Sequence, residues 1–130
     1  MTEGKKMRST EDFFEEMMKF FPEIVAEIEE MKQVYPEGCD TLILEDIIMP
    51  RVVALLRRNV ETDKLEALFQ YFELIACCAD DVLSDNFSVC CLEILGNEKL
   101  ILERAKKYIG PVTARLQREA DLALGRKVEE

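Results

Sequence analysis

Histidine is absent from this chain of 130 residues. Imidazole is the side chain most often used for proton transfer near neutral pH, and it is the commonest metal ligand in proteins. Its absence weakens the case for an enzyme, and it excludes the di-iron site of helical bundles, which pairs Glu-x-x-His motifs with further glutamates. We therefore expect a protein that is not an enzyme and that has no cofactor and no metal.

Two hydrophobic patterns are also missing. No stretch of the chain approaches the roughly 20 uncharged residues that span a bilayer, and residues 1–10 lack the apolar segment of a signal peptide. No segment of useful length alternates apolar and polar residues, so strands are not expected. These absences predict one helical domain over residues 1–130 in the cytoplasm, with flexible ends at 1–9 and 125–130.

Cysteine occurs five times, which is an odd number in a chain without an export signal, and this argues against a disulfide framework. Neighbouring residues on a helix point about 100° apart, so the two Cys-Cys pairs do not suit a zinc ion. Helical spacing predicts that Cys78, Cys90 and Cys91 are buried. Only Cys77 and Cys39 are then candidates for a reactive thiol.

Acidic residues outnumber basic ones by 27 to 17, and the net charge is −10. The imbalance is uneven along the chain: residues 1–49 have 13 acids and 5 bases, whereas residues 97–130 have 6 acids and 8 bases. A negative field repels phosphate backbones and anionic lipid headgroups. We therefore expect neither nucleic acid nor a membrane as a direct partner.

Apolar residues recur at helical spacing through the whole chain, and capping residues, glycines and prolines separate the helices. The fold class expected is all-α, with six to eight helices in antiparallel hairpins that form a helical bundle or a short α-solenoid. The helices predicted in this way span residues 10–21, 22–34, 40–60, 62–79, 85–95, 98–109 and 111–124.

Segment 40–60 is apolar on almost every side, which is typical of a helix buried among several others. Pro50 cannot donate to the carbonyl of Asp46, so the segment either kinks or restarts there, and we favour a kink. Glu45 and Asp46 lie in this apolar helix. They form either an internal pair with one of the arginines that follow or a polar pocket at the kink.

Acidic side chains gather on the outer faces of the first two predicted helices. A solvated face is the ordinary explanation, a carboxylate metal site is a weaker one, and a docking surface for a basic partner is the functional one. Phe20 lies off the apolar stripe, so it could form an exposed anchor for a partner or a second copy of the chain. The candidate partner-binding residues are Glu11, Glu15, Glu16, Phe20, Glu23, Glu27 and Glu30.

Two segments end in or contain a glycine turn: residues 92–96 (LEILG) and residues 105–113 (AKKYIGPVT). Together with the Phe-rich acidic start and a middle helix like 65–78, they resemble an uncharacterised family of small, acidic, all-helical bacterial proteins. The resemblance implies a HEAT-like fold, and some relatives of that family are suspected to be toxin-immunity proteins. The resemblance implies no catalytic residue. Its Gly-Pro motif, at Gly110 and Pro111, marks the end of one helix and the start of the next, so it indicates the fold and not a function.

These observations support one leading hypothesis: a cytoplasmic, non-enzymatic protein-binding domain. Its specific form is an immunity protein whose acidic helical face covers the basic site of a toxin domain, with association that weakens as salt rises. The alternative is a helical scaffold or regulatory adaptor that self-associates into a homo-oligomer. A carboxylate-metal enzyme is the third hypothesis.

Overall fold

The computed structural model describes residues 7–126, and within that range it contains seven helices and no strand. Two of the seven are long helices with a π-helical middle, and each has three labelled parts. The helices are α1 (Thr10–Phe20), α2 (Ile24–Val34), α3 with η1 and α4 (Asp40–Leu42, Ile43–Ile48, Met49–Arg58), α5 (Thr62–Cys78), α6 with η2 and α7 (Asp81–Asn86, Phe87–Leu92, Glu93–Leu95), α8 (Lys99–Ala105) and α9 (Pro111–Ala123). The predicted all-α bundle is confirmed.

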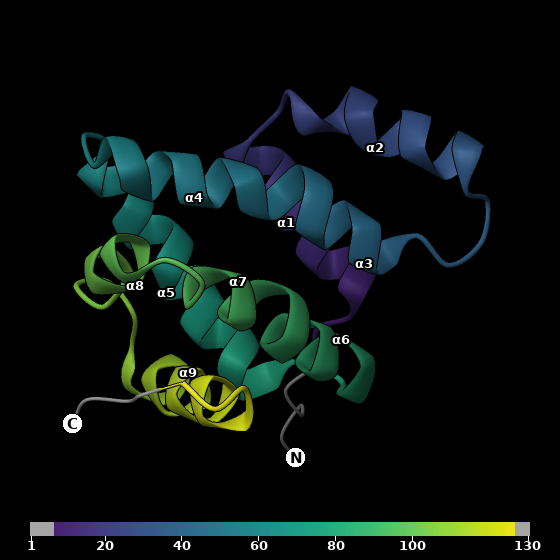
Figure 1. The fold of residues 1–130 in the computed structure, drawn as a ribbon. Coiled ribbons are helices and arrows are strands. Elements are labelled where there is room, and N and C mark those ends of the chain that lie inside the picture. The colour runs from purple at the N-terminus through teal and green to yellow at the C-terminus, as the bar shows by residue number, and fades with distance from the viewer. Residues whose placement is uncertain (1–6, 127–130) are drawn as a thin grey trace, which may run out of the picture.

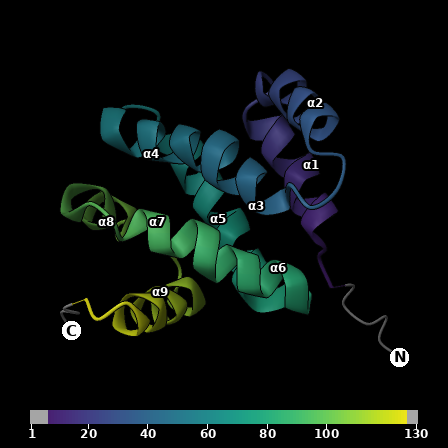
Figure 2. The same ribbon diagram turned by 45° about the vertical axis from the view of Figure 1, so that its right-hand side comes forward.

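Helix α5 lies in the middle of the molecule, between α1 and α9. Both views place α2 and α9 at opposite ends, with the two long helices between them (Figures 1 and 2). On one side of α5, Tyr71 stacks on Phe13 of α1 at 5.9 Å between ring centroids. On the other side, Glu73 hydrogen-bonds to the backbone of α9. Neighbouring positions of α5 therefore contact α1 on one side of the bundle and α9 on the other.

Phenylalanine rings form the centre of the core. Phe13, Phe69 and Phe72 are fully buried, and Phe87 is almost so. The ring centroids of Phe69 and Phe72 lie 5.0 Å apart, and those of Phe72 and Phe87 lie 5.6 Å apart, both pairs edge to face. Burying each ring contributes roughly 2 kcal/mol. This cluster joins α1, α5 and η2 into one core.

The helix over residues 40–58 continues through Pro50, so the alternative of a restart at that proline is wrong. The six residues of η1 are π-helical, and the N–H of Met49 donates to the carbonyl of Leu44, five residues earlier. The wider turn suits a proline, which has no N–H to donate and whose ring conflicts with the carbonyl four residues before it. The distortion that we expected as a kink is thus a π-helical segment.

Glu45 and Asp46 are exposed, so the interpretation of buried acids in this helix is wrong. They lie on the solvent side of a helix that buries positions 43, 44, 47 and 48. The nearby guanidinium of Arg51 binds carboxylates of α2 instead: its Nε lies 3.2 Å from Glu23 and its Nη1 lies 3.0 Å from Glu27. These ion pairs attach α2 to the long helix.

Several helix ends differ from the predicted ones for local reasons. The helix expected to start at residue 85 starts at 81, because the Asp80 side chain accepts a hydrogen bond from the N–H of Leu83 at 2.8 Å. A cation in the last turn of a helix usually stabilises the end of that same helix. Arg104, in the last turn of α8, donates to the carbonyl of Leu56 at 3.0 Å and so stabilises the C-terminal end of α4.

The described ends of the chain are bonded to the body of the domain. The N–H of Arg8 donates to the carbonyl of Cys78, and the N–H of Asp80 donates to the carbonyl of Arg8, each at 2.8 Å. Residues 1–6 and 127–130, where we expected most of the flexibility, lie outside the described residues. Within residues 7–126, no helix combines the length and the apolar character needed to cross a bilayer.

Candidate functional site

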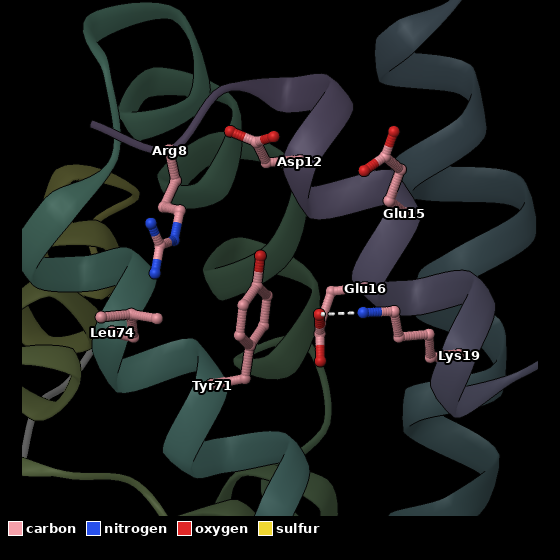
Figure 3. Close-up of a pocket in the computed structure, with 7 residues that line it drawn as sticks. All are labelled: Arg8, Asp12, Glu15, Glu16, Lys19, Tyr71 and Leu74. Atoms are coloured by element: carbon pink, nitrogen blue, oxygen red, sulfur yellow. Dashed lines mark ion pairs between the residues drawn. The ribbon is translucent and has the colours of Figure 1, made fainter. Parts of the chain in front are cut away.

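A pocket of about 360 Å³ opens between α1 and α5 (Figure 3). Positions 12, 15, 16 and 19 of α1 have the spacing that places side chains on one helix face, and this face forms one wall. Residues 71 and 74 of α5 form the opposite wall. The lining residues are Arg8, Asp12, Glu15, Glu16, Lys19, Tyr71 and Leu74.

The N-terminal end of α1 is fixed beside this pocket by a capping box. The Ser9 hydroxyl accepts from the N–H of Asp12 at 3.1 Å, and the Asp12 carboxylate accepts from the N–H of Ser9 at 2.9 Å. The β-bridge between Arg8 and Ala79 holds the preceding residue against the end of α5. The Arg8 guanidinium and the Glu16 carboxylate therefore lie on either side of Tyr71, as Figure 3 shows.

Tyr71 supplies a neutral aromatic ring at the centre of the pocket. Burial, and then the negative charge of Glu16, raise the pKa of the phenol to about 12. The hydroxyl thus stays protonated at neutral pH, where it can donate or accept a hydrogen bond but is a poor base. The site therefore combines a neutral ring with three carboxylates, from Asp12, Glu15 and Glu16.

Most of the glutamates predicted to bind a partner make ion pairs within the chain. Glu16 lies 3.5 Å from Lys19, and Glu11 lies 3.6 Å from Lys32 of α2. Glu23 and Glu27 are the two carboxylates that bind Arg51. Within the described part of the chain, only two of the six predicted glutamates, at positions 15 and 30, have no ion pair.

Phe20 is not the exposed anchor that we predicted. Its side chain is largely buried and packs against the core, with its ring centroid 6.4 Å from that of Phe21. The end of α1 turns inward here, because Phe21 is itself buried and leads directly into α2. Among the predicted site residues, the structure thus brings Glu15 and Glu16 together in the pocket and leaves the others outside it.

The core-facing side of α9 was missed by the sequence reasoning. The apolar residues at positions 112, 116, 120 and 123 indicate one buried face, but the helix buries Thr113, Gln117, Ala120 and Asp121. Three polar residues at positions 113, 117 and 121 share one helix face, and this spacing is the signal that could have revealed them. Each of the three bonds to a group outside the α9 backbone.

Glu73 of α5 caps the N-terminal end of α9. Its carboxylate accepts hydrogen bonds from the N–H of Val112 and the N–H of Thr113, both at 2.9 Å, and from the Thr113 hydroxyl at 2.8 Å. Burial raises the pKa of Glu73, but these hydrogen bonds outweigh it, so the net pKa is lowered. A Cβ on Gly110 would lie 2.5 Å from the carboxyl carbon. Glycine is needed there to admit the carboxylate.

A second network ties the other end of α9 to the end of the long helix α6–α7. The Arg126 guanidinium lies 2.8 Å from the Asp121 carboxylate and donates to the carbonyl of Glu93 at 3.2 Å. The Gln117 amide donates to the carbonyl of Leu92 at 2.8 Å. Gly96 has a φ of −84°, so it is not the left-handed residue that a glycine after a helix usually indicates. A Cβ there would lie 2.5 Å from Arg126 Nη1, so glycine gives the network room.

The cysteines follow the helical prediction with one exception. Cys90 and Cys91 are buried, Cys78 is largely buried and Cys77 is exposed, but Cys39 is buried and so is not the second accessible thiol. Burial, and then a hydrogen bond to Glu45, raise the pKa of Cys90 to about 12. Within residues 7–126, no three Cys, Asp or Glu side chains come together in a group that could hold a metal ion.

This burial pattern predicts the reactivity of the thiols. With an aromatic disulfide reagent at pH 8, the native protein should release one equivalent of chromophore rapidly, from Cys77, because a thiolate must be both formed and accessible to react. A C77S variant should lose that rapid phase, and the unfolded wild type should release five equivalents. Rapid reaction of the C77S variant would show that a second thiol is open in solution.

Comparison with known proteins places this chain by family. No curated protein and no solved structure matches it. One family matches residues 14–123, which include the larger part of α1, the whole of the long helices and both glycines of the α9 networks. The chain therefore belongs to the family described as Domain of unknown function (DUF7674).

Proposed function

We propose that this protein is a protein-binding domain that docks a basic segment of a partner on its acidic N-terminal helices. One lysine or arginine side chain of the partner enters the pocket between α1 and α5 and lies beside Tyr71. The observation that carries the proposal is the composition of that pocket, whose lining contains a neutral aromatic ring and three carboxylates, among them Glu15.

The charges that line the pocket favour a single cation. Of the three carboxylates, Glu16 is paired with Lys19, and Asp12 accepts a hydrogen bond from the N–H of Ser9. Glu15 has no ion pair in the described part of the chain, so it offers an unmatched carboxylate to an incoming cation. A guanidinium or ammonium beside a tyrosine ring gains a cation–π interaction in addition to the ion pair.

Long-range charge supports the same partner. Residues 1–49 contain 13 acids and 5 bases, which gives the N-terminal helices a negative field that speeds encounter with a basic protein. Such binding would cover the basic surface of the partner and would involve no catalysed reaction.

In its most specific form, the proposal is an immunity protein that occludes the basic site of a toxin domain in the cytoplasm. The alternative is an adaptor that self-associates.

Fluorescence anisotropy with a labelled octa-lysine peptide tests the proposal directly. The E15Q variant should bind about fivefold more weakly than wild type, because one charge-assisted contact is lost, and affinity should fall as salt rises. The matched control is E119Q, which removes one exposed acid on α9. Equal weakening by E15Q and E119Q would show that only net charge matters, and the docking site would then be rejected.

A further inference from the structure

A second and larger pocket, of about 820 Å³, lies at the opposite end of the bundle between α8 and α9. Its volume is in the range typical of small-molecule sites. Figure 1 shows α8 and α9, whose residues form most of its lining, and the turn that follows α7. The pocket is lined by Gly96, Asn97, Lys99, Leu102, Glu103, Lys106, Ile109, Gly110, Pro111, Ala114, Gln117, Arg118, Asp121 and Arg126.

The charged groups around this pocket are mainly positive, although the whole chain has a net charge of −10. Arg126 and Asp121 neutralise each other. The three remaining cations, Lys99, Lys106 and Arg118, have no ion pair within residues 7–126, and a single further acid, at position 103, faces them. Within the described residues these groups leave an excess of two positive charges around one cavity of an acidic protein, where an anion would be attracted.

The remaining wall of the pocket is apolar. Leu102 and Ile109 contribute side chains from α8 and the turn after it, and Pro111 and Ala114 contribute the first turn of α9. The exposed cations and the less exposed side chains of Leu102 and Ile109 match a ligand with an anionic group at one end and an apolar body at the other.

Gln117 provides an independent observation at the same place. The residue is 3% exposed, and its amide nitrogen donates to the carbonyl of Leu92, yet its Oε1 accepts no hydrogen bond within the described residues. Turning the amide over would place Oε1 against that carbonyl and against the carboxylate of Asp121, so the orientation is fixed. A buried acceptor without a donor is unfavourable. A ligand N–H or O–H would satisfy it.

We propose that the pocket between α8 and α9 binds a small organic anion that has an apolar body and a hydrogen-bond donor. The anion interacts with Lys99, Lys106 and Arg118, the body packs on Leu102 and Ile109, and the donor reaches Gln117. This site is separate from the acidic pocket of α1 and α5, so the proposal does not rest on the proposed function.

Indole-3-propionate is a suitable probe because it has a carboxylate, an apolar ring and one N–H. Titrated into the ¹⁵N-labelled protein, it should shift the side-chain amide signals of Gln117 in a saturable way and raise the melting temperature. Tryptamine, which replaces the anion with a cation, should bind at least about tenfold more weakly. The 1-methylindole analogue, which lacks the N–H, should also bind more weakly.

Two neighbouring lysines give a matched pair of variants. K106E reverses a charge in the pocket and should weaken indole-3-propionate at least about tenfold, whereas K107E reverses an exposed charge outside the lining and should not. A114F should block binding by filling the cavity. The proposal is overturned if the probe gives no saturable shift up to about 10 mM, if tryptamine binds equally well, or if K106E and K107E behave alike while both remain folded by circular dichroism.

Discussion

Replacing Arg126 with methionine is expected to lower the free energy of unfolding by about 2–3 kcal/mol. The Asp121 side chain is only 7% exposed, and Arg126 is its ion-pair partner at 2.8 Å. Removal of the guanidinium leaves a buried carboxylate without its counter-charge, and it also frees the carbonyl of Glu93. Methionine keeps much of the aliphatic packing, so the loss reports the charge. Urea unfolding followed by circular dichroism measures it.

Another arginine near the same end of the chain provides the control. Arg115 lies 3.9 Å from Glu119, and both side chains are 64% exposed, so R115M should change stability by less than about 0.5 kcal/mol. In a D121N background the carboxylate is absent, and R126M should then cost less than in wild type. If R126M is no more harmful than R115M, the Asp121–Arg126 pair does not stabilise the attachment of α9.

The core of this fold could be predicted because the spacing of apolar residues records which side of each helix is buried. Phe13 and Met17 lie four residues apart on α1, Phe69 and Phe72 lie three residues apart on α5, and all four are fully buried. This pattern needs no knowledge of distant partners, since any helix with such a stripe must cover it. The number of helices followed from the same reasoning.

Polar contacts between distant segments could not be predicted in this way. The sequence indicates that Glu23 and Glu27 lie on a solvated helix face. The cation that binds them is Arg51, which is 28 residues after Glu23 and 24 residues after Glu27. The availability of each acid for a partner therefore depends on tertiary structure. The acidic character of the N-terminal surface was predictable, whereas the pocket beside Tyr71 was not, because it requires α1 and α5 to be adjacent.

The reason for a glycine at positions 96 and 110 also depends on distant segments. A glycine after a helix usually indicates a left-handed residue, but Gly96 and Gly110 both have a φ of −84°. At each position the missing Cβ makes room for a carboxylate network: Asp121 with Arg126 at the first, and Glu73 at the second. Close approach of a side chain is as good a reason for glycine as backbone conformation, and sequence alone does not distinguish the two.

The second large effect is expected at the start of α9. The E73A variant should lose about 2 kcal/mol of stability at pH 7, because the carboxylate accepts three hydrogen bonds from Val112 and Thr113. The pKa of Glu73 is lowered in the folded state, so its contribution is complete above the unfolded-state pKa of about 4.3 and is lost as pH falls through the folded-state pKa. The stability difference between wild type and E73A should therefore shrink below about pH 4.

A double-mutant cycle with Gly110 separates this cap from ordinary packing. G110A alone should cost about 1–2 kcal/mol, because the three nearest atoms to the new Cβ, all within 3 Å, belong to Glu73 and must move away from α9. In the E73A background those atoms are gone, so G110A should cost almost nothing, and alanine could even stabilise the turn by restricting the unfolded chain. Additive losses in the double variant would mean that Gly110 is required for its backbone and not for the Glu73 cap.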